Sequence, residues 1–109
     1  MSSLVPEIEI SEIPSDAYLL DVREPDEWIA GHIDGAGHIP MNEVPGRLTE
    51  VPESGQIVVI CKGGGRSARV TAFLNQQGRT AVNLSGGMIA WAHAGRPMVS
   101  DIFEDPYVA

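Results

Sequence analysis

The most constraining feature of the sequence is an uninterrupted run, Gln56 to Ile60, that leads directly into a cysteine, a lysine and three glycines. The run ends in four β-branched residues with no polar alternation, which is typical of a strand buried on both faces of a parallel sheet. From Ser67 onward, Val70, Phe73 and Leu74 have the i, i+3, i+4 spacing of one helix face. The segment therefore predicts a buried strand, a glycine-rich loop and a helix in succession.

The rest of the chain alternates short apolar runs with helical or loop segments. We expect strands at Ile8–Ile10, Tyr18–Val22, Gly37–Pro40 and Ala81–Leu84, and helices at Pro25–Gly31, Asn42–Glu50 and Met88–Ala92. Strands and helices that alternate over such short distances are joined by right-handed crossovers and form a mainly parallel sheet. The expected fold class is therefore α/β. Sites in such sheets lie beyond the carboxyl ends of the strands, where Cys61 is expected.

The length of 109 residues fits one domain, since single domains commonly have about 100–150 residues. We expect residues 1–109 to form this domain, with a core over about residues 6–97. Residues 98–109 carry three acidic and two aromatic side chains and are expected to form a loosely packed C-terminal extension.

Composition excludes several classes of function. The chain has 15 acidic and 7 basic residues, a formal charge of −8, which argues against a general surface for nucleic acid or anionic membranes. No apolar segment approaches the length that spans a membrane, and the N-terminus lacks the basic and apolar regions of a secretory signal. The single cysteine cannot form an internal disulfide and fits a reducing compartment, so a cytoplasmic protein is expected.

The surroundings of Cys61 favour an ionised, reactive thiol. A free cysteine titrates near about pH 8.5, so nucleophilicity at neutral pH requires positive potential at the sulfur. Glycines allow the loop N–H groups to turn inward, and the following helix adds the positive end of its dipole. A cysteine at a strand end is often only a small buried side chain, but the strand–loop–helix context with Lys62 and Arg66 favours a functional thiol. The loop matches neither the phosphate-binding nor the dinucleotide-binding glycine motif.

Two other groups of residues are candidates for chemistry. Asp21 and Arg23 could act as an acid and an anion-binding base, but a pair at a strand end is more often a structural salt bridge or cap, which we favour. His32, His38 and His93 match no usual set of metal ligands. No metal site is therefore predicted.

Four groups of residues, in order over about residues 6–97, resemble the signatures of the rhodanese domain family. They are Leu20–Arg23 with Glu24 and Trp28; Gly31–Ile33 with Gly35, Ala36, Ile39 and Pro40; Cys61–Ser67; and Leu84–Met88 with Trp91. Together they are far more specific than any one of them alone.

The resemblance implies a five-stranded, mainly parallel sheet flanked by helices on both faces. It also implies a sulfurtransferase that carries sulfane sulfur as a persulfide on the catalytic Cys61. The residues that would bind the persulfide or the substrate are Lys62, Gly63, Gly64, Gly65, Arg66 and Ser67. The donor would be thiosulfate or a similar small anion, the acceptor cyanide, a thiol or another protein, and no metal or organic cofactor would be needed.

Two alternatives remain open at this point. The chain could be a sulfur-carrier or binding module with little turnover of its own. It could also be a phosphatase or an arsenate reductase of the same fold, but those enzymes have five residues between the cysteine and the arginine. Here four residues separate Cys61 from Arg66, so a phosphate ester is expected to fit poorly.

Overall fold

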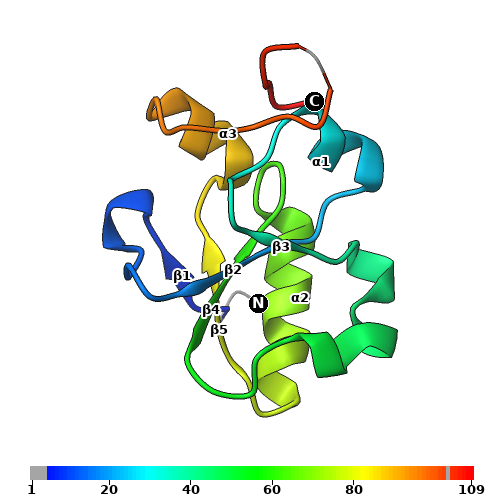
Figure 1. Ribbon diagram of the computed structural model, residues 1–109. Helices are drawn as coiled ribbons and strands as arrows, with labels where there is room; N and C mark the ends of the chain where they lie inside the picture. Colours follow the sequence, from blue (N-terminus) through cyan, green and yellow to red (C-terminus); the bar gives the residue numbers. More distant parts are fainter. Residues whose placement is uncertain (1–4, 103) are drawn as a thin grey trace.

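The computed structural model describes residues 5–102 and 104–109, which contain a five-stranded, all-parallel sheet (Figure 1). The strand order is β1-β5-β4-β2-β3, with the predicted buried strand β4 at the centre. The strands are β1 (Glu7–Ile8), β2 (Tyr18–Asp21), β3 (Gly37–His38), β4 (Gln56–Ile60) and β5 (Thr80–Leu84). The α/β fold class is confirmed.

Helices cover both faces of the sheet, as expected. They are α1 (Pro25–Ala30), α2 (Gly65–Gln76) and α3 (Gly87–His93), with the 3-10 helices η1 (Ile10–Glu12), η2 (Met41–Glu43) and η3 (Pro45–Glu50). Because side chains alternate along a strand, Val59 of β4 packs on the α2 side with Leu74, whereas Val58 packs on the α3 side with Met88. Strand β4 is thus buried on both faces.

Three expected elements differ from those in the structure, and the first is the strand expected at Gly37–Pro40, which ends at His38. The helix expected at Asn42–Glu50 is a pair of 3-10 helices, since Pro45 starts a new turn and Arg47 has non-helical dihedral angles of −121° and 23°. The strand expected at Ile8–Ile10 ends at Ile8, because Ile10 begins η1. The Glu12 carboxylate accepts a hydrogen bond from the Glu9 N–H and so caps this turn.

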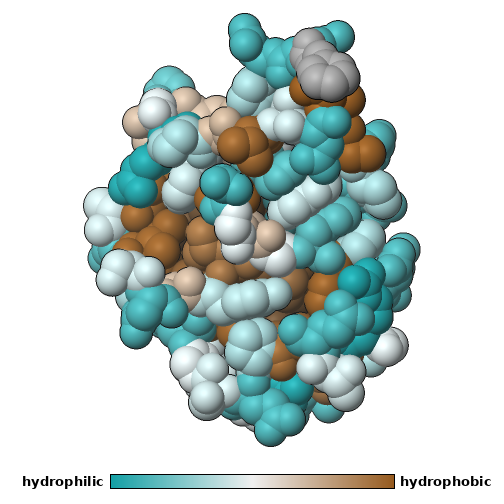
Figure 2. Space-filling view, in the orientation of Figure 1, coloured by the Kyte–Doolittle hydropathy of each residue, from teal (hydrophilic) through white to brown (hydrophobic). Residues whose placement is uncertain are grey.

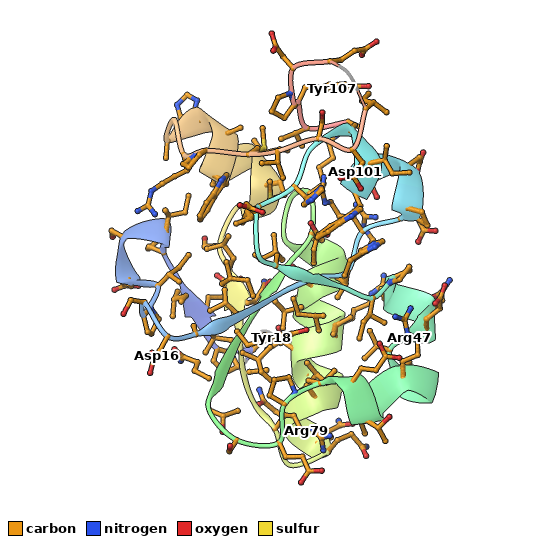
Figure 3. The ribbon with its side chains drawn as sticks, viewed as in Figure 1. Asp16, Tyr18, Arg47, Arg79, Asp101 and Tyr107 are labelled. Atoms are coloured by element: carbon orange, nitrogen blue, oxygen red, sulfur yellow. The ribbon has the colours of Figure 1, made fainter. Side chains whose placement is uncertain are left out.

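The C-terminal segment is held more closely than the sequence suggested. Val99 forms an antiparallel bridge with His32, with N–O distances of 2.8 and 2.9 Å, and the Tyr107 N–H donates to the Ala30 carbonyl at 3.1 Å. Figure 3 shows Asp101 and Tyr107 on this segment beside α1. The segment therefore packs against the end of α1 and the residues that follow it.

Within residues 5–102 and 104–109, none of the helices has the length and apolar character needed to cross a membrane. The expectation that the N-terminus is not a secretory signal includes residues 1–4, which lie outside the described residues.

Candidate functional site

The loop that follows β4 positions Cys61 at the carboxyl edge of the sheet. Figure 1 shows this loop between α1 and α3, just before α2 begins. Gly64 has a φ of +115°, a conformation that glycine adopts without the penalty of a Cβ, and it reverses the chain into α2. Lys62 and Gly63 are exposed, whereas Cys61 is only 1% exposed. The thiol therefore lies beneath an exposed loop.

Hydrogen-bond donors surround the Cys61 sulfur. The Gly64 N–H donates to Sγ at 3.0 Å, and the Ser67 Oγ lies 3.2 Å from Sγ. Burial raises the pKa of the Cys61 thiol, but the Ser67 hydroxyl and the N–H groups of Ser67, Gly64 and Gly63 outweigh burial and hold that pKa below its ordinary value. The loop thus stabilises negative charge on the sulfur.

The first turn of α3 fixes the orientation of the loop. The Met88 N–H donates to the Cys61 carbonyl at 2.8 Å, and the Ile89 N–H donates to the Lys62 carbonyl at 3.0 Å. At Gly87, which has a φ of +56°, a Cβ would collide with both of these carbonyl groups. Because the carbonyls turn toward α3, the N–H groups that follow can turn toward the sulfur.

Arg66, which the sequence predicted to bind substrate, is paired with a residue that the sequence did not single out. Its Nη1 and Nη2 atoms bind the Glu27 Oε1 and Oε2 atoms at 2.7 and 3.0 Å. Hydrogen bonding to Arg66 lowers the pKa of the Glu27 carboxyl to about 2. Glu27 lies 39 residues from Arg66 in the sequence, so no local pattern links the two. The pair ties α1 to the first turn of α2.

Glu27→Gln is expected to weaken the dependence of the unfolding free energy on pH below about 4.5. A carboxyl whose pKa falls from 4.5 to about 2 on folding contributes stability that is complete above pH 4.5 and is lost as the pH falls toward 2. The variant lacks this contribution, so its loss of unfolding free energy over that range should be smaller by about 2 kcal/mol, after allowance for solvent screening. Urea unfolding at several pH values measures it. Glu43→Gln, in an exposed pair with Arg47, is the control, and an equal effect there would contradict the assignment.

Ser67 belongs to a buried polar chain that the sequence did not predict. Ser67 Oγ lies 2.5 Å from Asn83 Oδ1, and the Asn83 Nδ2 donates to the Gly64 carbonyl and to Glu7 Oε2, each at 3.1 Å. Ser67 and Asn83 are 0% and 1% exposed. Asn83 interrupts the otherwise apolar end of β5, and this polar interruption is the one sequence signal that could have pointed to it.

The Asp21 and Arg23 side chains form a buried ion pair outside the loop. Arg23 Nη2 donates to Asp21 Oδ2 at 2.8 Å and to the Gly31 carbonyl at 2.7 Å, and both side chains are at most 2% exposed. The pair thus connects the end of β2 to the residue that follows α1. His32 and His38 both stack with Trp28, at centroid distances of 3.6 and 4.6 Å.

Arg23→Met is expected to lower the free energy of unfolding by about 3 kcal/mol, because it leaves the Asp21 carboxylate buried without its partner. Arg69→Met, at an exposed arginine, is the matched control and should stay close to wild type. Urea unfolding at neutral pH measures both. Equal free energies of unfolding for the two variants would show that the ion pair does not stabilise the fold.

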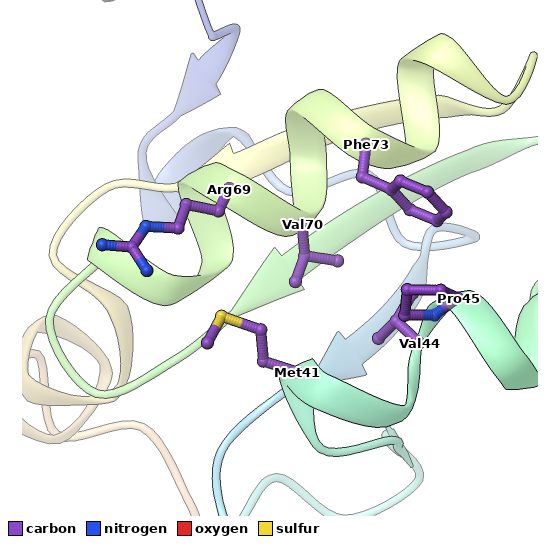
Figure 4. A pocket seen from close by; sticks show the side chains of 6 residues that line it. All are labelled: Met41, Val44, Pro45, Arg69, Val70 and Phe73. Carbon is purple, nitrogen blue, oxygen red and sulfur yellow. The ribbon is translucent and has the colours of Figure 1, made fainter.

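A cavity of about 160 Å³ opens between α2 and the 3-10 helices η2 and η3 (Figure 4). It is lined by Met41, Val44, Pro45, Arg69, Val70 and Phe73. Val44 and Val70 also belong to the buried cluster that contains Cys61. The cavity therefore lies against the same buried cluster as Cys61. Hydrophobic side chains also show at the top of Figure 2, beside the C-terminal segment.

Comparison with known proteins adds to this geometry. Residues 8–94 match the family model described as a rhodanese-like domain. The chain is 43% identical over 86 residues to a protein of Allochromatium vinosum named a sulfurtransferase, which covers 78% of this chain and 80% of that protein. It is 37% identical over 97 residues to YrkF of Bacillus subtilis, whose name describes a sulfur carrier, covering 83% of this chain and 52% of that protein.

Solved structures also have a similar fold. A solved structure of a rhodanese-related protein from Thermoplasma volcanium superposes with a TM-score of 0.81 at 33% identity, over 86% of this chain and 97% of that one. The region matched by the family model, residues 8–94, contains strands β2 to β5, the loop after β4 and the glycine pair that begins α3. By its motifs, its fold and its relatives, the chain belongs to the rhodanese-like domain family.

Proposed function

We propose that this protein is a sulfurtransferase that moves sulfane sulfur from thiosulfate or a similar donor to a thiophilic acceptor through a persulfide on Cys61. The observation that carries the proposal is the set of donors around one buried sulfur, with the Gly64 N–H at 3.0 Å and the Ser67 Oγ at 3.2 Å. Donors placed in this way stabilise a thiolate, and the loop N–H groups among them can also stabilise the anionic outer sulfur of a persulfide.

The reaction divides into two displacements at sulfur. In the first, the Cys61 thiolate attacks the outer sulfur of thiosulfate, a new S–S bond forms, and sulfite leaves with the electron pair of the bond that breaks. In the second, cyanide or a thiolate attacks the outer sulfur of the persulfide, and Cys61 leaves as a thiolate. The cycle is complete without an oxidant or reductant, as expected of ping-pong covalent catalysis.

The basic residues near the loop suit a small anion. Lys62 is exposed beside the mouth of the loop, and Arg66 lies at the start of α2. Because Arg66 already binds the Glu27 carboxylate, we assign Arg66 mainly to holding the loop and Lys62 to attracting the donor. A single thiol that must stay reduced between cycles also fits a reducing compartment such as the cytoplasm.

Mass spectrometry of the protein after incubation with thiosulfate tests the proposal. We expect the Cys61 peptide to gain the mass of one sulfur atom and to lose it on addition of cyanide, with an equal amount of thiocyanate formed. Cys61→Ser should gain no mass. Absence of the added sulfur in the wild type would contradict the proposal.

The resemblance to a protein named as a sulfur carrier supports a second candidate, a carrier module with little turnover. This candidate predicts the same gain of sulfur on Cys61 but negligible repeated formation of thiocyanate. Hydrolysis of aryl phosphates is expected from neither, and its detection would favour the phosphatase alternative despite the short loop.

A further inference from the structure

In the hydrogen-bond chain next to Cys61, Ser67 has two neighbouring acceptors but only one hydroxyl hydrogen. Ser67 Oγ lies within hydrogen-bonding distance of Cys61 Sγ, at 3.2 Å, and of Asn83 Oδ1, at 2.5 Å. A hydroxyl group has one hydrogen, so Ser67 donates to only one of these two acceptors at a time. The other contact must be made in another way or lost.

The contacts of Asn83 determine which way its amide points. The Nδ2 atom faces the Glu7 carboxylate and the Gly64 carbonyl, each at 3.1 Å, and both of these groups only accept hydrogen bonds. The two hydrogens of Nδ2 are thus both used, and the amide cannot turn over without losing both bonds. The Oδ1 atom, which only accepts, is therefore held toward the Ser67 hydroxyl.

Two arrangements of the chain follow, one for each protonation state of Cys61. With a neutral thiol, the S–H group donates to Ser67 Oγ, and Ser67 donates to Asn83 Oδ1, so every group has a partner. With a thiolate, which only accepts, the Ser67 hydrogen turns to Sγ and Asn83 Oδ1 loses its donor. Asn83 is 1% exposed, and an unpaired buried acceptor is unfavourable.

We propose that Asn83 is a positioning residue that competes with Cys61 for the single hydroxyl hydrogen of Ser67 and thereby restrains the ionisation of the free thiol. The same competition operates during transfer. In the persulfide, the inner sulfur has neither a hydrogen nor a full charge, so Ser67 turns back to Asn83. When the acceptor removes the outer sulfur, Ser67 turns again to the departing thiolate. Ser67 thus changes partner with the covalent state of Cys61.

Charged groups near Cys61 come from several elements and must stay constant in a test. They are Lys62 on the loop, Arg66 on α2 with Glu27 on α1, and Glu7 on β1 behind Asn83. Asn83→Ala replaces one neutral side chain by another and alters the charge of none of these groups, although Glu7 loses its hydrogen bond from Asn83 Nδ2. A change in the acidity of the Cys61 thiol in this variant therefore cannot result from the gain or loss of a nearby charge.

The test compares wild type, Asn83→Ala, Ser67→Ala and the double variant, with no sulfur donor present. Thiolate formation is followed by ultraviolet absorbance against pH, and thiol reactivity by alkylation with iodoacetamide below the wild-type midpoint. In Asn83→Ala, the thiolate should form at lower pH, and alkylation should be about fivefold faster than in wild type. In the Ser67→Ala background, the Asn83 substitution should change the rate by less than about twofold.

The double variant separates positioning from a loosened loop, because Asn83 also binds the Gly64 carbonyl. Equal acceleration in both backgrounds, or no acceleration in either, would overturn the proposal. Circular dichroism checks the fold. If Asn83→Ala does not fold, NMR replaces it: the side-chain amide signals of Asn83 should move at the thiolate midpoint in wild type but not in Ser67→Ala, and static signals in wild type would overturn the proposal.

The proposal rests on the proposed function only in taking Cys61 as the reacting thiol. Because the measurements use no sulfur donor, a protein that fails to take up sulfur could still show the competition for the Ser67 hydrogen. Conversely, unchanged thiol acidity in the Asn83 variants would contradict the competition for the Ser67 hydrogen but not the proposal that Cys61 transfers sulfur. Failure of one is therefore distinguishable from failure of the other.

Discussion

Replacement of Cys61 by serine should abolish sulfur transfer from thiosulfate to cyanide while the fold is retained. Serine has nearly the same shape, but its hydroxyl stays protonated at neutral pH and is a poor nucleophile toward sulfur. Loss of a catalytic nucleophile lowers turnover by several orders of magnitude, so we expect a decrease of at least about 1,000-fold. Formation of thiocyanate measures the rate, and circular dichroism checks the fold.

The chain offers a clear control for this result. Because Cys61 is the only cysteine, no other thiol can carry sulfur in the variant or obscure the labelling of the wild type. Thr49→Ser, a small change at an exposed position of η3, should retain wild-type activity. Comparable rates for Cys61→Ser and wild type would show that the transfer does not pass through this sulfur.

Much of the site was predictable because its parts are close together in the sequence. The β-branched run of β4, the glycines after it and the apolar spacing of α2 are local patterns, and the structure places all three as predicted. The carboxyl edge of a parallel sheet then follows from the alternation of strands and helices. Cys61 could be placed there before any coordinates were known.

The partners of the loop could not be predicted, because they come from distant elements. Glu27 is 39 residues from Arg66, and Glu7 is 76 residues from Asn83. An acidic residue in the first turn of a short helix is common for reasons of helix capping alone, so its sequence position does not reveal a partner. Such pairs become visible only when the sheet order brings the elements together.

Backbone pairing was the other feature that the sequence could not show. Val99 joins His32 through main-chain hydrogen bonds, which any residue except proline can make in both directions. The acidic composition of residues 98–109 suggested a loosely packed extension, whereas the contacts of its backbone decide how it lies. The split of the predicted Asn42–Glu50 helix, in contrast, has a local cause in Pro45, which begins η3.

Gly87→Ala should be the most damaging substitution outside the loop itself. A methyl group there would collide with the carbonyls of Cys61 and Lys62, and the φ of +56° disfavours any side chain. Conformational strain and overpacking together should lower the free energy of unfolding by about 4 kcal/mol. Because the same carbonyls hold the loop against α3, sulfur transfer should also fall, by at least about tenfold in the protein that remains folded.

Gly95→Ala isolates the cause of this effect. Gly95 also has a positive φ, +73°, but a Cβ there would meet nothing within 4 Å. It should therefore show only the conformational strain, about 1 kcal/mol, with sulfur transfer close to wild type. Urea unfolding and thiocyanate formation measured on both variants separate the two contributions. If Gly87→Ala and Gly95→Ala lost equal amounts of unfolding free energy and of sulfur transfer, the close approach of α3 to the loop would not position the sulfur. The donors around Cys61 would then be held by α2 alone.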